Sequence, residues 1–300
     1  MATDILAARR AWIESDVPVA PRSYSGEIWS RFARNRVGVI ALIVLTLVVV
    51  TAVAAPLLTK YDPLKGQTAE RLKPVASGAH LLGTDELGRD MLTRLLYGGR
   101  LSLLGGFVPV VVATILGTAI GAIAGYLGGA AGAVLMRVLD MFYAFPAILL
   151  AIAIGASLGP GIRNAMIALS IVFIPPIARV AEAATRRVVV HEYIEAARLS
   201  GASTFQLVTK QVLVNIVNPI FVYASGLVGV SMIVAASLSF LGLGSKPPTP
   251  EWGYMLNSLR SSIYVNPWVA ALPGLFIFIT SVSFNMLSDA IRESMDIKRA

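Results

Sequence analysis

The chain has 300 residues, of which 56% are hydrophobic and only 14% are charged, and its mean hydropathy is +0.74. Soluble domains average about a quarter charged residues, so this composition excludes an ordinary soluble protein and indicates one that buries apolar surface in lipid. The net charge of +8 is explained by basic residues flanking membrane spans, and we expect no nucleic-acid partner. The chain has no cysteine, which excludes disulfides and thiolate metal sites.

The first 36 residues predict a tail that ends in a helix lying on the membrane surface. Acidic residues and prolines interrupt this stretch, so it does not read as a cleavable signal peptide. From Glu27 to Arg36, the apolar side chains of Ile28, Trp29 and Phe32 alternate at helical spacing with basic residues. That pattern suits the interface between headgroups and acyl chains, and the first span should be an uncleaved anchor.

Six apolar runs predict six membrane spans, because a spanning helix needs about 20 mostly apolar residues. The runs cover residues 37–58, 101–126, 138–158, 165–178, 216–243 and 267–287. The fourth run is the shortest and contains Pro175-Pro176. We therefore expect an all-α polytopic membrane protein with a loop at residues 59–100, a core domain at 101–290 and a C-terminal tail at 291–300.

The distribution of basic residues predicts the orientation of the chain in the membrane. Arg31, Arg34 and Arg36 lie directly before the first span, and such residues favour the cytoplasmic side. Six spans then return the C-terminus to the cytoplasm and place residues 59–100 outside.

A helix is expected inside the outer loop. Thr84-Asp85-Glu86 can begin it, since polar N-terminal residues satisfy free amides and favour the helix dipole. Its apolar face would end at Gly98-Gly99, and we favour a surface helix that only joins two spans.

The second span carries Gly117, Gly121 and Gly125 at a spacing of four residues, which places them on one helix face. Small residues at this spacing allow two helix backbones to approach closely in lipid. We interpret them as a packing face.

The chain carries no recognisable catalytic centre. No glycine precedes a lysine, so a G-x-x-x-x-G-K-[ST] phosphate loop is excluded. The two histidines, His80 and His191, lie outside the expected spans, and we expect no metal site, no cofactor and no catalytic residue. Arg163 is the one ionisable residue between Asp140 and Arg179, which argues against coupling to protons or sodium ions.

Residues 186–215 form a polar segment between two apolar runs. Good helix formers from Val188 to Ser200 predict a helix, and Gly201 suits the turn that follows, where positive φ is needed. Thr204 to Leu213 can form a second short helix. The segment would project Glu192, Glu195, Arg198 and Lys210 into water, and we favour a docking element over an ordinary solvated loop.

The run Glu192-Tyr193-Ile194-Glu195-Ala196-Ala197-Arg198-Leu199-Ser200-Gly201 resembles the Glu-Ala-Ala loop of a family of permeases. The family comprises the C-type permease subunits of bacterial dipeptide, oligopeptide and nickel ABC importers. Further stretches resemble the same family, namely residues 34–36, 80–90, 97–103, 239–244 and 247–253.

The resemblance implies the type I permease fold of ABC importers, with six spans and cytoplasmic coupling helices in the bacterial inner membrane. It also implies a homologous permease partner, an external binding protein, and two ATPase subunits that hold ATP and Mg. The implied coupling residues are Tyr193, Glu195, Ala196, Ala197, Arg198 and Gly201. Val214 stands where the family often has proline, and without that break the helix can continue.

Short peptides are the substrate that the resemblance favours, with nickel chelates, glutathione and other peptide-like solutes left open. A structural scaffold of a membrane complex is the alternative from another class. An intramembrane enzyme is disfavoured because no buried nucleophile–base pair exists. Trp252 and Tyr254 are candidates for contact with the binding protein or substrate, although an aromatic belt at the membrane interface explains them better.

Overall fold

A computed structural model describes residues 24–295, so the expected tails at residues 1–23 and 296–300 lie outside the described part. The described chain is helical, and its only β pairing consists of two isolated bridges, Ser77 with His80 and Thr84 with Asp90. The membrane and core helices are α2 (Tyr24–Arg34), α3 (Arg36–Val53), α4 (Ala55–Leu58), α5 (Met91–Leu127), α6 (Gly129–Tyr143), α7 (Ala147–Leu158), α8 (Ile162–Val189), α11 (Leu213–Phe240) and α13 (Pro267–Met295).

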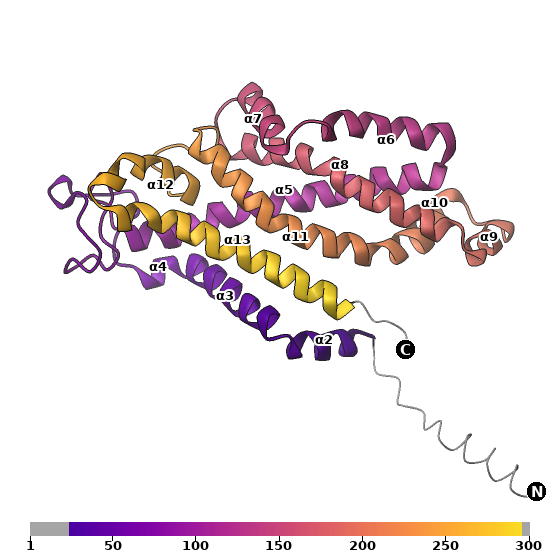
Figure 1. The fold of residues 1–300 in the computed structure, drawn as a ribbon, viewed down its shortest axis with the longest axis horizontal. Coiled ribbons are helices and arrows are strands. Elements are labelled where there is room, and N and C mark those ends of the chain that lie inside the picture. The colour runs from indigo at the N-terminus through magenta and orange to yellow at the C-terminus, as the bar shows by residue number, and fades with distance from the viewer. Residues whose placement is uncertain (1–23, 296–300) are drawn as a thin grey trace, which may run out of the picture.

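Shorter elements lie at the two ends of the bundle. One end holds the loop between α4 and α5, the 3-10 helices η1 (Thr68–Glu70) and η3 (Leu259–Tyr264), and α12 (Trp252–Ser258). The opposite end carries α9 (Glu192–Leu199), α10 (Thr204–Gln206) and the π-helix η2 (Leu207–Val212). The long helices α5, α8, α11 and α13 run between these ends (Figure 1).

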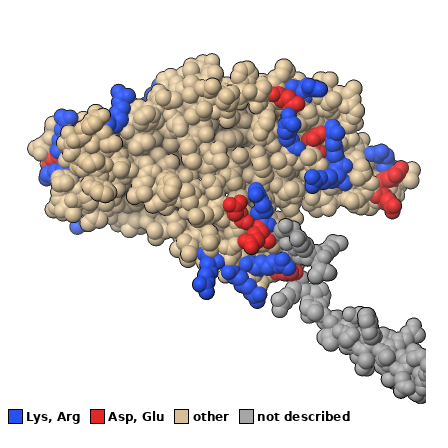
Figure 2. Space-filling view, viewed as in Figure 1, with Lys and Arg blue, Asp and Glu red and all other residues tan. Residues whose placement is uncertain are grey.

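Five helices are long and apolar enough to cross a membrane, and the bent pair α6–α7 would make a sixth span. The expected all-α membrane fold is therefore confirmed. Figure 2 shows a wide band without Lys, Arg, Asp or Glu across the middle of one face, with charges gathered toward both ends. This distribution fits a hydrocarbon layer between two polar surfaces.

The third span departs from the straight helix that the apolar run predicts. The chain breaks between Tyr143 and Ala147, and α6 and α7 meet at a bend of 87°. Pro146 lies at this break with φ of −55° and ψ of 127°, which is not helical. Proline lacks an N–H and disfavours helical geometry at the residue before it, which accounts for the break.

The beginning of α5 also differs from expectation. The helix begins at Met91 rather than at Thr84, and Asp90 caps it by accepting a hydrogen bond from the Thr93 amide at 2.8 Å. The predicted surface helix is therefore the first part of one 37-residue helix. Gly98 and Gly99 lie inside this helix and do not end it. They leave room for the ring of Trp252, which would lie 3.0 Å from a Cβ at Gly99.

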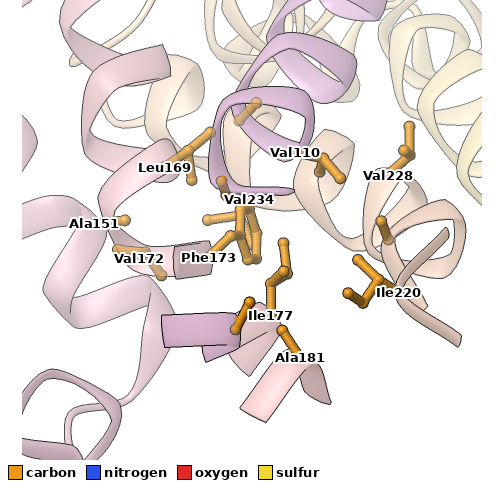
Figure 3. Packing of buried hydrophobic residues seen from close by; sticks show 14 of the residues in the cluster. Val110, Ala151, Leu169, Val172, Phe173, Ile177, Ala181, Ile220, Val228 and Val234 are labelled. Carbon is orange, nitrogen blue, oxygen red and sulfur yellow. The ribbon is translucent and has the colours of Figure 1, made fainter. Parts of the chain in front are cut away.

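The core lies where α5, α7, α8 and α11 meet (Figure 3). Leu169, Phe173 and Ile177 from α8 pack there with Val110 from α5 and Ile220 from α11. The predicted packing face of α5 also lies against α8. A Cβ at Gly117, Gly121 or Gly125 would fall within 3.0 Å of α8 atoms, so these positions have no room for one.

Candidate functional site

The segment between α8 and α11 projects from the end of the bundle opposite the loop between α4 and α5 (Figure 1). α8 ends at Val189, and His191 begins α9 in an extended conformation. The single helix expected from Val188 to Ser200 is thus divided in two by a turn. This turn sets α9 apart from the axis of α8 as a separate short helix.

The docking of α9 against the bundle rests on one buried side chain. Ile194 is buried and belongs to the same apolar cluster as Ile177 and Ile220. The next helix is held in a similar way by Leu207 and Val212, both buried. Two apolar anchors on either side of a polar turn fix the position of α9 while its other faces stay open to solvent.

The turn after α9 has the geometry that the sequence predicts. Gly201 has φ of +87°, in the region that favours glycine. Its amide donates to the carbonyl of Arg198 at 3.0 Å, and the Ala202 amide donates to that of Ala197 at 3.1 Å. Ser203 and Gln206 then form a capping box that begins the next helix.

Val214 lies inside a continuous helix. The chain from Thr204 to Phe240 runs through α10, η2 and α11 as one stretch long enough to span a membrane. The structure thus shows no helix end at Val214, the position where the sequence left the end of the second short helix open. The first turns of this stretch have π-helical geometry, which is frequent at functional sites.

The outward face of α9 combines charge with apolar surface. Glu192, Glu195 and Arg198 are exposed, as are Tyr193 and Ala196, whereas Ala197 is half-buried. Figure 2 shows acidic and basic side chains gathered at this end of the molecule. Glutamates in the first turn and arginine in the last also match the helix dipole.

Sequence reasoning missed two large apolar side chains beside this face. Leu199 is 84% exposed and Phe205 is 76% exposed, on either side of the Gly201 turn. The sequence signal for these two residues was their apolar character within an otherwise polar segment. Apolar patches rimmed by polar groups mark interaction sites, so the projection has the character of a docking surface.

One polar contact connects α9 with the end of α5. A guanidinium nitrogen of Arg198 lies 3.4 Å from the hydroxyl oxygen of Tyr126, and the guanidinium carbon lies 5.8 Å from the centre of the same ring. Tyr126 comes one residue before the last residue of α5. Arg198 is therefore exposed but reaches back to the bundle, and it is not free to serve only a partner protein.

Trp252 is placed differently from the expected contact residue. Its side chain is 1% exposed, its indole N–H donates to the Leu95 carbonyl at 2.8 Å, and its ring meets Phe276 edge to face. Burial in the second apolar cluster leaves it unavailable to a partner, and its role is packing. Tyr254 is half-buried and stays a prediction.

A buried ionic cluster organises the opposite end of the molecule. His80 lies between two carboxylates, with Nδ1 2.9 Å from Asp90 and Nε2 3.0 Å from Glu70. Ionised carboxylates only accept hydrogen bonds, so both contacts are satisfied by an imidazolium that donates from both nitrogens. Within residues 24–295 no group of three His, Asp or Glu side chains is arranged to hold a metal.

The protonation of this cluster follows from its contacts. Burial lowers the pKa of His80, but hydrogen bonds to Asp90 and Glu70 outweigh burial, so the pKa is raised above its ordinary value of 6.5. The hydrogen bond from Lys73, followed by that from His80, lowers the pKa of Glu70 below its ordinary value of 4.5. The cluster therefore holds a charged histidine where the loop meets α5.

Comparison with known families assigns the chain. The family described as the inner membrane component of binding-protein-dependent transport systems matches residues 117–298. The chain belongs to this family. A second family description, the N-terminal transmembrane domain of oligopeptide transport permease C, matches residues 23–74. The chain is thus a multi-pass permease subunit of the inner membrane, and the projection that carries α9 lies within the matched core.

Similar proteins are transport permeases along nearly their whole length. The glutathione transport system permease protein GsiD of Pectobacterium atrosepticum is 43% identical over 91% of this chain and 90% of its own length. The di/tripeptide transport system permease protein DppC of Pseudomonas aeruginosa is 42% identical over 91% of each chain. These relatives place the permease among the subunits of peptide ABC importers.

A solved structure shares the fold. The MetNI methionine ABC transporter, in an inward-facing conformation, contains a chain that matches with a TM-score of 0.55 and 19% identity. The match covers 68% of this permease and 97% of that chain. At this identity the likeness shows the fold, which is the expected type I permease fold of ABC importers.

Proposed function

We propose that this permease forms half of the translocation path of an ATP-driven importer for short peptides, and that α9 docks into an ATPase subunit. The exposed face of α9, with the Gly201 turn and the apolar side chains of Leu199 and Phe205, carries the proposal. ATP and Mg would be bound by two ATPase subunits, because this chain has no phosphate loop. An external binding protein would deliver the peptide.

A second, homologous permease would complete the path. An apolar groove of about 610 Å³ runs between α5, α11 and α13, lined by side chains that include Phe107, Ile115, Phe221 and Leu287. An open groove of this kind in one subunit supports a path shared by two subunits. ATP-driven movement of the docked α9 would then tilt the spans and alternate access between the two sides.

The proposed orientation places α9, α2 and both termini in the cytoplasm. Arg31, Arg34 and Arg36 next to the first span support it. The long loop with the His80 cluster would then face the outside, where a binding protein could reach it.

Glutathione is the second candidate substrate, since the relative from Pectobacterium atrosepticum is named for glutathione transport. Glutathione is itself a small peptide, so both substrates fit one path. Nickel chelates and a purely structural scaffold are further alternatives that a panel of ligands and an ATPase assay would separate.

The docking proposal can be tested by crosslinking, because the chain has no cysteine and every introduced thiol is unique. Leu199→Cys should crosslink to the ATPase subunit of the purified complex. Tyr264→Cys, 92% exposed near the opposite end, is the matched control and should not. Crosslinking of Tyr264→Cys but not Leu199→Cys would reverse the orientation, and crosslinking of neither would contradict the docking proposal.

A further inference from the structure

Arg179 of α8 holds the last turn of α6 with two different contacts. Its guanidinium forms an ion pair with Asp140 and stacks over the ring of Tyr143, with the guanidinium carbon 5.5 Å from the ring centre. Asp140 and Tyr143 are three residues apart, so both side chains lie on one face of α6. One side chain of α8 therefore fixes both the position and the rotation of this turn.

The turn that Arg179 holds comes directly before the break in the third span. α6 ends at Tyr143, α7 begins at Ala147, and the two helices meet at 87°. Every residue from Met141 to Leu149 is exposed, so few contacts from the rest of the chain restrain the corner. Pro146 has no N–H to donate back to α6, and its carbonyl accepts from the Leu150 amide within α7 at 3.0 Å. The bend can therefore change without the loss of a hydrogen bond from the Pro146 nitrogen.

The same helix that carries Arg179 leads into the docking projection. α8 continues from Arg179 to Val189 without a break, and α9 begins at Glu192. Ten residues of helix span about 15 Å, and a helix moves over such a distance as a rigid body. Displacement of α9 would therefore reach Arg179 through the backbone of α8.

We propose that Arg179 is a positioning residue that carries the movement of α9 to the bend between α6 and α7. The inference rests on the proposed docking of α9 to an ATPase. When α8 shifts, the guanidinium draws Asp140 and Tyr143 with it, and the unrestrained corner changes its angle. α7 contacts both α8 and α11, and α11 lines the groove of the proposed path. A change of the bend angle would therefore move α7 against a helix of that path.

The alternative interpretation is that the ion pair only stabilises α6 against α8. It makes a different prediction. Half-exposed ion pairs contribute little to stability, and the side chains of Arg179 and Asp140 are 49% and 37% exposed. Loss of the pair should then lower transport no more than loss of a similar pair elsewhere. The pair between Arg31 and Glu27 in α2, with side chains 44% and 37% exposed, is that matched control.

The test compares Arg179→Gln with Arg31→Gln in the complete complex reconstituted in lipid. Arg179→Gln should raise the ATP hydrolysed per peptide transported by about fivefold or more, the lower end of allosteric coupling. Arg31→Gln should leave the ratio unchanged. Tyr143→Leu, which keeps the ion pair, should show a smaller rise, and exchange of the charges in the double variant Asp140→Arg/Arg179→Asp should restore part of the coupling.

A distance measurement distinguishes positioning from stability. Spin labels on Phe145→Cys and on Val190→Cys, an exposed residue directly after α8, should show a distance that changes when ATP binds. Arg179→Gln should abolish the change while the folded complex persists. An unchanged ratio and an unchanged distance response in Arg179→Gln would overturn the inference while leaving the proposed function intact. Absence of ATP-dependent uptake in the wild-type complex would instead overturn the proposed function.

Discussion

Gly121 of α5 lies so close to Ala178 of α8 that an added Cβ would fall 2.2 Å from the Ala178 carbonyl oxygen. The same Cβ would lie 2.7 Å from the Cβ of Ala181. Both obstacles belong to the partner helix and not to the end of a flexible side chain. Contact between the two backbones therefore requires glycine at this position.

Gly121→Ala should destabilise the permease by about 1–3 kcal/mol, the usual effect of overpacking. Gly26→Ala is the matched control, because nothing lies within 4 Å of its added Cβ and alanine favours helix. Thermal unfolding of the solubilised complex measures both. Equal melting temperatures for Gly121→Ala and wild type would contradict the close contact of α5 and α8 at this position.

Gly201→Val should separate ATP hydrolysis from uptake. Gly201 has φ of +87° with open space around it, so the substitution strains the backbone by about 1–2 kcal/mol without a steric clash. Gly242→Val introduces similar strain at φ of +84°, also in open space but away from α9. Uptake and ATPase activity measured together should show loss of coupling in Gly201→Val alone. Equal effects in the two variants would argue against a role of this turn in coupling.

Glu195→Lys should weaken the association with the ATPase subunit, because it reverses a charge on the exposed face of α9. Asp62→Lys reverses an exposed charge in the loop at the opposite end and should have no such effect. Retention of the ATPase during affinity purification at low salt provides the measurement. Equal retention of the ATPase by Glu195→Lys and Asp62→Lys would show that the Glu195 carboxylate does not contribute to the association.

The loop between α4 and α5 should lose stability as the pH rises. The pKa of His80 is raised in the folded state, so its stabilising contribution is complete below the unfolded pKa of 6.5 and disappears as the pH rises through the folded pKa. Glu70 has the opposite sign, and its contribution is lost as the pH falls below 4.5. Protection factors of residues 70–90, which correct hydrogen exchange for its intrinsic base catalysis, should fall as the pH rises from 6 to 9.

Two histidine variants isolate the source of this pH dependence. His80→Gln should remove the alkaline fall in protection, because no proton can then be lost from position 80. His191→Gln alters an exposed residue beside α9 and should retain it. A pH profile in His80→Gln equal to that of wild type would assign the effect to another group.

The sequence was sufficient for features that depend on local composition. Long apolar runs located the spans, the spacing of Gly117, Gly121 and Gly125 indicated a shared helix face, and Gly201 was expected at positive φ. Each of these features follows from residues within a few turns of one another. Val214 left the end of the second short helix open, and only the structure shows that the helix continues to Phe240.

Features set by long-range contacts could not be predicted in this way. Pro146 breaks the third span, whereas Pro175 and Pro176 lie inside α8. Neighbouring helices decide whether a membrane helix tolerates proline. Trp252 is aromatic and close to the expected interface. Its buried position depends on a hydrogen bond to the Leu95 carbonyl, 157 positions earlier in the chain. The ion pair between Asp140 and Arg179 likewise joins two separate spans.

The central claim is that this permease couples ATP hydrolysis on a partner to the uptake of peptides. The most direct test is ATP hydrolysis by the purified complex in lipid, with and without loaded binding protein, across di- to pentapeptides, glutathione and nickel chelates. We predict that peptide-loaded binding protein stimulates hydrolysis and that removal of this chain abolishes the stimulation. Hydrolysis that responds to no ligand in the intact, folded complex would contradict the account.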